Sequence, residues 1–583
     1  SISKMEAEKL RWVPDSLYNS AVAAIVATPN TFNHFRRELK SLPEDVQFDI
    51  YQGLFNNNEQ NLLHHEFGHL DIFSRILRVN NKRAQLHYIF QTLMDHNSKI
   101  IRRLTDQFLA QMTPSRLSDQ VDRVKILHVG LALGGFFSEA GWFSESERVY
   151  QACLDAVRQD SSEAGLFRAV EYCVRLLHVQ NANCKYHAAK QTCTEAFSLV
   201  ERLSHKGFTV NCAILYSEQC GLLFAQSLYD EAFKACSKAL QELNSTVNTR
   251  TVIDVLRQCA KACVVKREFK KAEVLIKLAV FQARERFGFD HPKYSDALLD
   301  YGFFLLNVDA ITSAVHVYQL ALSIRMKVFG GSNLHVAIGC EDLAYATYVF
   351  EYSSGKFGDA KEHAQKAIDI LCSILPPDHL LLSSSKRVKA LILEEIAIDS
   401  HDKEQEDKYL GEAQDLHLQS LELAKKAFGE NNVQTAKHYG NLGRLFQSMH
   451  RFEEAEEMHL KAIDIKERLL GPDDYEVALS VGHLASLYNY DMNKYQEAER
   501  LYLRSINIGK ALFGEAYSGL EYDYRGLLRL YHNTGATDLA LHFSNVLADW
   551  NNLRDQTNAS QVKPLDFDVN DSLENIISKH FLS

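Results

Sequence analysis

Residues 433–462, VQTAKHYGNLGRLFQSMHRFEEAEEMHLKA, decide the fold. Within them, Gly443 and Ala455 stand twelve residues apart. Two antiparallel helices approach closely only where a side chain is nearly absent, so a glycine and an alanine at this spacing indicate the two arms of a helical hairpin. Leu442 and Phe446 flank the glycine at helical spacing and are expected to fill the seam on either side. This stretch therefore predicts a tightly packed helix-turn-helix unit.

The same unit returns along most of the chain. The small residue of each unit stands at Ser146, Ala189, Ala232, Ala272, Ala314, Ala360, Ala413, Ala455, Ala498 and Ala540. Successive positions lie 40 to 53 residues apart, mostly 42 or 43. Several units end in Phe-Gly or Leu-Gly, where glycine is expected to form a left-handed helix cap, at Gly288, Gly330, Gly429, Gly471 and Gly514. The series predicts an all-α solenoid of about ten hairpins.

This pattern resembles the tetratricopeptide family, and its long step is similar to that of the repeats of kinesin light chains. The resemblance covers roughly Val121 to Asp549. It is weaker at Ser146, where the aromatic residue is displaced, at Ala413, which follows the polar insertion 399–408, and at Ala540 in the last unit. These departures affect the boundaries of the units and not the architecture.

Composition limits the class of protein. Among 583 residues, 46% are hydrophobic and only nine are proline, which is typical of a chain that is folded nearly throughout. The net charge of −11 is spread along the chain, which argues against nucleic acid as the main ligand. Eleven cysteines without a C-x-x-C pair indicate core residues in a reducing compartment, so we expect a cytoplasmic and nuclear protein. No apolar run is long enough to cross a membrane, and residues 1–10 lack the apolar core of a signal peptide.

Two short apolar helices are predicted before the repeats. In SLYNSAVAAI, residues 16–25, one helical stripe is formed by Leu17, Ala21 and Ile25. In LPEDVQFDI, residues 42–50, the corresponding residues are Leu42, Pro43, Val46 and Ile50. The simplest interpretation is a pair of ordinary amphipathic helices that pack on the solenoid.

In their order and spacing the two segments resemble the elongin-binding box and the cullin-2 box of tetratricopeptide substrate receptors of cullin-2 ubiquitin ligases, although Ala21 stands where cysteine is frequent. Stretches such as KACVVKREFKKAE and YEVALSVGHLASLYNYDMN extend this resemblance to nearly the whole chain before the tail. It implies that the first stripe binds elongin C, with elongin B, and that the second binds cullin-2. The implied organisation is a box region at 10–56, a helical linker region at 57–120, the solenoid at 121–550 and a tail at 551–583.

The resemblance also implies a non-catalytic adaptor that recognises degrons near substrate C-termini, with an arginine and a glycine. The alternative that it leaves open is a cargo adaptor, associated with microtubules, kinesin or membranes at their surface, that binds sorting peptides such as the tail of the amyloid precursor protein. The chain lacks the heptad coiled coil that would join a motor heavy chain, which favours the ubiquitin ligase hypothesis.

Peptide-contacting residues are predicted from their offset to the small residues, because the first helix of each hairpin should line the concave face. The central repeats offer an acidic and aromatic set: Asp296, Glu341, Tyr345, Glu394 and Glu395. The last repeats offer a basic and polar set: Lys437, Asn441, Arg444, His483, Ser486, Asn489, Tyr522, Arg525 and Arg529. Arginine and carboxylate groups of a degron would complement these sets, with Gly440 and Gly482 allowing close approach. Each residue taken alone is more simply a solvated helix face.

One motif points to enzyme chemistry. His65-Glu66-Phe67-Gly68-His69 fits H-E-x-x-H, which on a helix places two imidazoles for zinc and a glutamate for general base catalysis. The third ligand is missing, because Ile72 and Arg75 occupy the downstream positions. We therefore expect no metal, no cofactor and no catalytic site.

Overall fold

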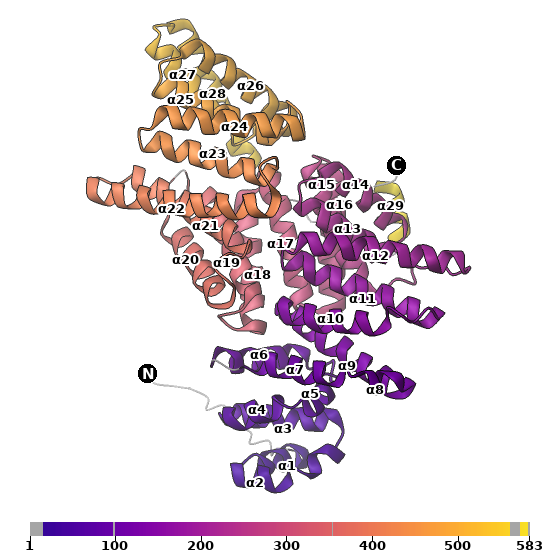
Figure 1. The fold of residues 1–583 in the computed structure, drawn as a ribbon. Helices are drawn as coiled ribbons and strands as arrows, with labels where there is room; N and C mark the ends of the chain where they lie inside the picture. Colours follow the sequence, from indigo (N-terminus) through magenta and orange to yellow (C-terminus); the bar gives the residue numbers. More distant parts are fainter. Residues whose placement is uncertain (1–15, 97–98, 353, 560–571, 581–583) are drawn as a thin grey trace, which may run out of the picture. The chain divides into compact units, whose positions relative to one another are not determined.

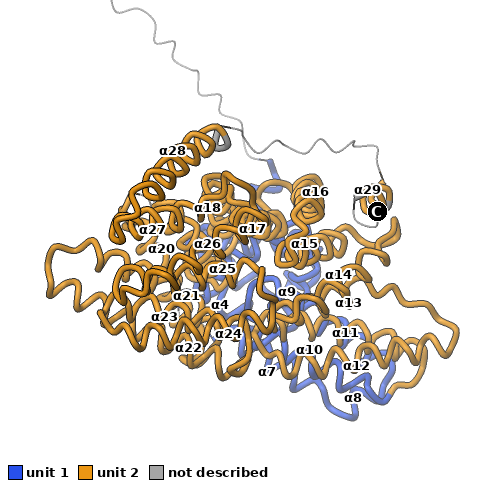
Figure 2. The backbone as a smooth tube through the Cα atoms, turned by 90° about the horizontal axis from the view of Figure 1, so that it is seen from above, with its two compact units in different colours: residues 1–159 blue, residues 160–583 orange. Residues whose placement is uncertain are grey.

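The computed structural model describes residues 16–96, 99–352, 354–559 and 572–580. Within these ranges the chain forms α-helices, one short 3-10 helix and no strand (Figure 1). None of the described helices is long and apolar enough to pass through a bilayer. The chain divides after Gln159 into unit 1, residues 1–159, and unit 2, residues 160–583 (Figure 2). This division lies inside the predicted repeat region.

Unit 1 contains mostly short helices, followed by one long hairpin. Its elements are α1 (Leu17–Ile25), α2 (Pro29–Phe35), the 3-10 helix (Glu38–Ser41), α3 (Glu44–Asn56), α4 (Gln60–Phe67), α5 (Leu70–Ile76), α6 (Arg83–Asp95), α7 (Ile100–Gln111), α8 (Pro114–Ser118), α9 (Gln120–Glu139) and α10 (Phe143–Val157). Phe73, Phe90 and Phe136 form the centre of its core, with ring centroids 5.0 to 5.3 Å apart. These buried aromatic rings connect the short helices to the hairpin.

Unit 2 consists of nine helical hairpins in sequence order and one further helix (Figure 1). The hairpins are α11 (Glu163–Ala182) with α12 (Tyr186–His205), α13 (Ala213–Ala225) with α14 (Tyr229–Gln241), α15 (Thr249–Val265) with α16 (Phe269–Phe287), α17 (Pro292–Asn307) with α18 (Ile311–Phe329), α19 (Leu334–Glu351) with α20 (Gly358–Ile374), α21 (Leu381–Ile398) with α22 (Lys403–Phe428), α23 (Val433–Ser448) with α24 (Phe452–Leu470), α25 (Tyr475–Tyr490) with α26 (Tyr495–Phe513), and α27 (Leu520–Asn533) with α28 (Thr537–Ala559). The further helix is α29 (Leu573–His580).

The predicted hairpins are confirmed, together with the physical reason for their small residues. All ten positions of the small-residue series lie on the second helix of a hairpin and are buried. A Cβ atom on Gly302 would stand 2.6 Å from the ring of Tyr318, and one on Gly443 would stand 2.8 Å from the ring of His459. The two helices of these hairpins therefore approach one another more closely than any residue with a side chain would allow.

The glycine stops behave differently from the prediction in one respect. Gly288 has a φ of 86°, as expected for a residue that only glycine adopts easily, but its ψ is 179°. Gly429 repeats this geometry, with a φ of 79° and a ψ of −177°. These glycines are therefore not left-handed α caps; they turn the chain through an extended, mirror-β conformation that carries it into the next hairpin.

Unit 2 is wound so that each of its first four hairpins contacts the hairpin that follows it five places later in the sequence. The amide of Asn432 donates to the carbonyl of Gln226 at 2.8 Å, over a separation of 206 residues. Asp309 accepts from the amide of Ser518 at 2.9 Å, over 209 residues. Arg267 lies 3.7 Å from Asp474. Unit 2 is therefore a superhelix with about five hairpins per turn, and successive turns contact each other.

Candidate peptide-binding face

The first helices of the hairpins in unit 2 share one polar face, which we call the concave face. It consists of the side chains on α11, α13, α15, α17, α19, α21, α23, α25 and α27 that contact side chains of other first helices. The pKa of Tyr475 on α25 lies well above its usual value because of nearby Tyr517, because of burial, and because of Tyr345, which is three hairpins away on α19. The contacts between hairpins five apart in sequence show that unit 2 curves.

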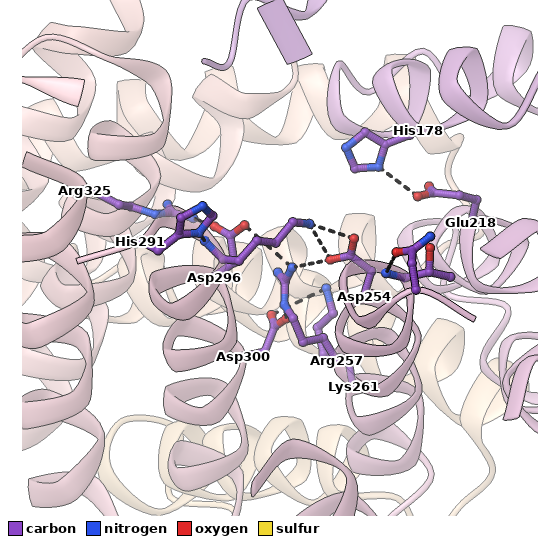
Figure 3. A network of polar contacts seen from close by, with 12 residues as sticks. His178, Glu218, Asp254, Arg257, Lys261, His291, Asp296, Asp300 and Arg325 are labelled. Carbon is purple, nitrogen blue, oxygen red and sulfur yellow. Dashed lines mark hydrogen bonds and ion pairs between the residues drawn. The ribbon is translucent and has the colours of Figure 1, made fainter. Parts of the chain in front are cut away.

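The first half of this face is a network of paired charges (Figure 3). Arg257 donates to Asp300 at 2.8 Å and to Asp254 at 3.1 Å. Lys293 donates to Asp254 at 2.6 Å. These contacts link α15 to α17, and the bond of His178 with Glu218, 2.8 Å long, links α11 to α13 in the same way. The network was not predicted, because nothing in the sequence shows which charges meet.

The predicted ligand-binding residue Asp296 belongs to this network. Arg325 donates to it at 2.8 Å, and Arg257 lies 3.7 Å away. Burial alone would raise the pKa of Asp296, but the two arginines outweigh burial and hold the pKa below its usual value. Asp296 is therefore an ionised and already paired carboxylate.

Glu341 and Asp342 on α19 differ from the paired acids. Neither forms an ion pair within the described part of the chain, and Glu341 instead accepts a hydrogen bond from the hydroxyl of Ser385. Burial raises the pKa of Asp342 to about 8, and neighbouring Glu341 adds to this increase. Burial also raises the pKa of Glu341. Arg387 lowers the pKa of Glu341, and Arg325 and Lys261 lower that of Asp342, but none of them forms an ion pair with these acids, so a cation in direct contact would stabilise the pair.

The predicted acidic and basic sets meet instead of remaining apart. Arg444 on α23 donates to Glu395 on α21 at 2.7 Å and lies 3.8 Å from Glu394. One carboxylate oxygen of Glu394 is buried without a hydrogen bond, and burial raises the pKa of this residue to about 7 although Arg444 lowers it. Both sets of charge therefore contribute to one contact between neighbouring hairpins.

Lys437 is likewise engaged by an acid that was not predicted. It lies 3.0 Å from Glu476 on α25, and buried Lys466 lies 3.1 Å from the same carboxylate. Burial would raise the pKa of Glu476, but Lys437 and Lys466 outweigh burial and lower it. This triad has two cations and one anion, so it keeps a net positive charge.

The remaining predicted residues are placed in different environments. Ser486 and Asn489 are buried, and the side-chain amide of Asn489 donates to the carbonyl of Gly526 at 2.9 Å. Asn441 and His483 are half-buried. Tyr522, Arg525 and Arg529 are exposed; Arg525 pairs with Glu521 at 2.7 Å, and Arg529 lies over the ring of Tyr490. Asn489 therefore joins two helices, and its amide nitrogen is not available to a peptide.

Gly440 and Gly482 do not open the face to a ligand, contrary to the prediction. A Cβ atom on Gly482 would stand 3.0 Å from a carboxylate oxygen of Asp523 and 3.3 Å from the hydroxyl of Ser505. One on Gly440 would contact Ala462 and Ser480. Both glycines are buried, and Gly482 is packed more tightly against neighbouring side chains than a residue with a Cβ atom would ordinarily be.

The first predicted docking segment forms α1 in unit 1. Leu17 is 92% exposed and Ala21 is exposed, whereas Ile25 is half-buried. No residue of α1 is buried, although most of them are apolar. The hydroxyl of Tyr18 donates to Asp49 at 2.7 Å, which fixes α1 against α3. An apolar helix held with its stripe open is a feature of helices that dock into a partner.

The second predicted docking segment is only partly accessible. Pro43 is exposed, and Leu42 and Val46 are half-buried. Ile50 is fully buried inside unit 1. It packs α3 against the core and offers no side-chain surface to a partner.

The H-E-x-x-H motif is not on one helix. α4 ends at Phe67, so His69 lies beyond it, although the rings of His65 and His69 are 4.9 Å apart. Glu66 is buried, pairs with Arg36 at 2.6 Å and accepts from the hydroxyl of Tyr51 at 3.0 Å. Among the described residues, no cluster of three or more candidate ligands could hold a metal ion.

Comparisons with known proteins match parts of the chain to repeat models. Tetratricopeptide repeat models match residues 404–468 and 477–516. Among solved structures, a Rap protein complexed with competence and sporulation factor is 13% identical, with a TM-score of 0.48 over 67% of this chain and 99% of its own. A putative kinesin light chain of P. anserina with TPR-like repeats is 18% identical, with a TM-score of 0.28 over 38% of this chain and 97% of its own.

Full-length relatives are much more similar. Amyloid protein-binding protein 2 of Rattus norvegicus is 57% identical over 574 residues, which is 98% of this chain and 96% of the relative. The protein of the same name from Mus musculus gives the same values. With this identity over almost its whole length, the chain belongs to the amyloid protein-binding protein 2 family of tetratricopeptide-repeat proteins.

Proposed function

We propose that this protein is the substrate-recognition subunit of a cullin-2 ubiquitin ligase with elongin B and elongin C. The observation that carries the proposal is the open apolar stripe of α1, where Leu17 is 92% exposed. A leucine left in water is unfavourable by roughly 1.5 to 3 kcal/mol relative to a buried one, so a partner that covers it gains affinity. Pro43, Leu42 and Val46 would contact cullin-2, while Ile50 keeps α3 in place. All eleven cysteines are unpaired, which agrees with a cytoplasmic and nuclear protein.

Co-purification tests this docking role. The Leu17→Glu variant should no longer co-purify with elongin C and cullin-2, because a charge cannot enter an apolar pocket without a large desolvation cost. Leu541→Glu on α28 is the matched control, since Leu541 is also an exposed leucine, at 65%. Association that survives the Leu17→Glu change would refute the docking role of α1.

The same proposal assigns degron binding to the concave face. A degron that carries an arginine near its C-terminus would supply a cation in direct contact with Glu341 and Asp342, because guanidinium and carboxylate groups form paired, charge-assisted hydrogen bonds. Tyr345 and His483 would contact the peptide beside this pair. The proposal includes a glycine in the degron, but we assign no residue of the concave face to the recognition of that glycine.

Peptide titration tests this second part. The double variant Glu341→Gln and Asp342→Asn should weaken binding of an arginine-containing C-terminal peptide at least tenfold, on the order of the 1.5 to 3 kcal/mol that a charged hydrogen bond contributes. Glu285→Gln is the control, because Glu285 is an exposed acid on α16 that pairs with Arg284. Equal affinity of the double variant and the wild type would remove the acidic pair from the binding site.

A second candidate function is a cargo adaptor that binds sorting peptides such as the tail of the amyloid precursor protein. It is favoured by the name of the relatives, which describes binding to amyloid protein. Such an adaptor would use the same concave face and would have no need of the stripe on α1. Peptide binding by a chain that never associates with elongin C would therefore favour the adaptor, and microtubule sedimentation would then test its connection to transport.

A further inference from the structure

Arg387 on α21 is a cation of the concave face that has no anionic partner. Its guanidinium lies 5.4 Å from the centroid of the Tyr345 ring. Within the described part of the chain it has no carboxylate oxygen within 4.0 Å, although it is half-buried. By contrast, Arg444 on the next first helix, α23, and Arg257 on α15 each approach two or more carboxylates. Arg387 thus differs from these paired arginines and, like Glu341 and Asp342, forms no ion pair within the described residues.

Towards α22 and α23, the surroundings of Arg387 are positive or neutral, whereas Glu341 on α19 lies within electrostatic range of it. Burial, and then Arg387 itself, lowers the pKa of His438 to about 3. Burial also lowers the pKa of His417 well below its usual value, with His438 and Arg387 adding to the effect. Lys437 also lies close enough to contribute to the low pKa of His438. Both imidazoles are therefore neutral, and within the described residues no carboxylate forms an ion pair with the guanidinium.

Glu341 on α19 is a carboxylate within electrostatic range of Arg387, but it already has another hydrogen-bond partner. It accepts a hydrogen bond from the Ser385 hydroxyl and stands beside Asp342. Arg387 lowers the pKa of Glu341 only as a minor contribution after burial and two serine hydrogen bonds. The face thus holds an acidic pair on α19 and a guanidinium on α21 that influence each other electrostatically, although none of the three groups forms an ion pair among the described residues. Because α19 and α21 belong to adjacent hairpins that pack together, the two sites are neighbours.

The guanidinium of Arg387, which has no ion-pair partner, is suited to bind an anionic ligand. A half-buried charge without a partner is unfavourable, and a ligand anion would remove this cost. The planar guanidinium matches the two oxygens of a carboxylate, and the ring of Tyr345 restrains the plane in which the N–H groups point.

We propose that Arg387, oriented by Tyr345, is an anion subsite for a peptide carboxylate, adjacent to the cation subsite of Glu341 and Asp342. This inference rests on the proposed binding of peptides by the concave face and specifies their chemistry: the preferred peptide is bipolar. Packed helices are about 8 to 10 Å apart and an extended peptide covers about 3.3 to 3.6 Å per residue, so about three residues separate the basic group from the acidic one. The carboxylate comes from an aspartate or glutamate side chain or from the peptide's own C-terminus.

Fluorescence titration of the full chain with labelled synthetic peptides tests the subsite. The peptides carry one arginine and one aspartate separated by about two to four glycines, with an amidated C-terminus; a second series has asparagine in place of aspartate, and a third ends in a free carboxylate at the same position. We expect the best-spaced aspartate peptide to bind about tenfold more tightly than its asparagine counterpart. A gain in the third series alone would identify the C-terminal carboxylate as the source.

Variants separate this subsite from the face as a whole. Arg387→Gln should abolish the preference for aspartate and leave the affinity of the asparagine peptide unchanged, whereas Glu341→Gln with Asp342→Asn should weaken both peptides. Arg387→Lys, which keeps the charge and loses the planar fork, should retain part of the preference and guards against a folding defect of Arg387→Gln. Arg468→Gln, which removes an exposed arginine of the second helix α24, is the control.

The two proposals fail in different ways. Wild-type protein that binds the peptides but shows no preference for a carboxylate at any spacing would overturn the anion subsite and leave peptide binding intact. The subsite would also be overturned if Arg387→Gln weakened the aspartate and asparagine peptides equally. Absence of binding for all peptides, or no effect of the acidic double variant, would overturn the proposed function itself.

Discussion

At the scale of single residues, the ionisation of Asp342 makes the stability of the protein depend on pH. Its pKa is about 8, mainly because of burial, whereas an unfolded chain gives the usual value near 3.8. The charged groups around it are Glu341 and Asp300, which raise the pKa, and Arg325 and Lys261, which lower it. Because the folded state keeps a proton that the unfolded state releases, stability falls as the pH rises from about 4 to about 8.

Replacing Asp342 by asparagine should therefore raise the melting temperature at pH 8.5 by a few degrees, because the amide removes the cost of ionising a buried carboxyl. The difference from the wild type should shrink steadily as the pH falls and should vanish near pH 4, where both states of the wild-type chain are protonated. Differential scanning calorimetry across this range measures it. A variant that is less stable than the wild type at pH 8.5 would contradict the assigned ionisation.

Sequence reasoning found individual residues of the face but not their partners. The offset rule placed Asp296, Glu341 and Arg444 on first helices, because helical periodicity determines which way a side chain points. Whether a charge is free depends on the neighbouring hairpin, and Arg444 turned out to neutralise acids that were predicted to be available. Arg387 and Asp342 were missed for the same reason, since only the absence of a partner distinguishes them.

At the scale of elements, the contact between α21 and α23 shows how neighbouring hairpins are coupled. Arg444 is 19% exposed, and its partners Glu394 and Glu395 are still less accessible. The serine hydroxyl of Ser448 donates to Glu394 at 3.2 Å, which completes a small polar cluster between the two first helices. Removal of one member leaves the other charges buried without compensation.

Arg444→Gln should consequently lower the stability of unit 2 by about 2 to 3 kcal/mol, somewhat below the full cost of breaking a buried pair because Glu394 can take up a proton. The loss should be smaller at pH 6 than at pH 8, since the pKa of Glu394 is about 7. Urea denaturation followed by circular dichroism measures the shift. Arg525→Gln, which breaks an exposed pair on α27, should change stability by less than about 0.5 kcal/mol, and an equal effect of both variants would contradict this account.

The hairpins themselves could be predicted because their signals are local. The small residue, the aromatic residue and the terminal glycine all act within one unit of some 42 residues, so their regular spacing can be recognised in the sequence. The turns inside the hairpins left no such signal, because Arg267 and Asp309 adopt positive φ there without being glycine. Such residues are tolerated because later hairpins hold them in place, and that contact is visible only in three dimensions.

At the largest scale, the winding of unit 2 is held by contacts between hairpins that lie five apart in sequence. Asp309, in the turn between α17 and α18, accepts a hydrogen bond from the amide of Ser518 and pairs with Arg554 on α28 at 2.5 Å. Arg267 similarly reaches Asp474 and lies over the ring of Tyr475. A solenoid with contacts only between neighbours would be free to open, whereas these contacts fix the curvature of the concave face.

Asp309→Asn tests whether this closure holds the face in shape. Asparagine tolerates the positive φ at this position, so the change removes the charge without straining the turn. The ion pair with Arg554 is lost, and its two partners are only 12% and 16% exposed, so local opening of α27 and α28 should become roughly tenfold more frequent. Hydrogen exchange should accelerate at Ser518 and around the α17–α18 turn while the central hairpins stay protected.

The matched control is Asp290→Asn, because Asp290 also pairs with a cation, Lys327, but both groups are mostly exposed. Its loss should leave exchange at Ser518 unchanged. If Asp309→Asn accelerates exchange and also weakens peptide binding, the closure sets the geometry of the concave face, because Asp309 itself lies in a turn and not among the predicted contacts. Unaltered exchange at both segments would mean that the hairpin interfaces alone determine the winding, and that the long-range contacts follow from it.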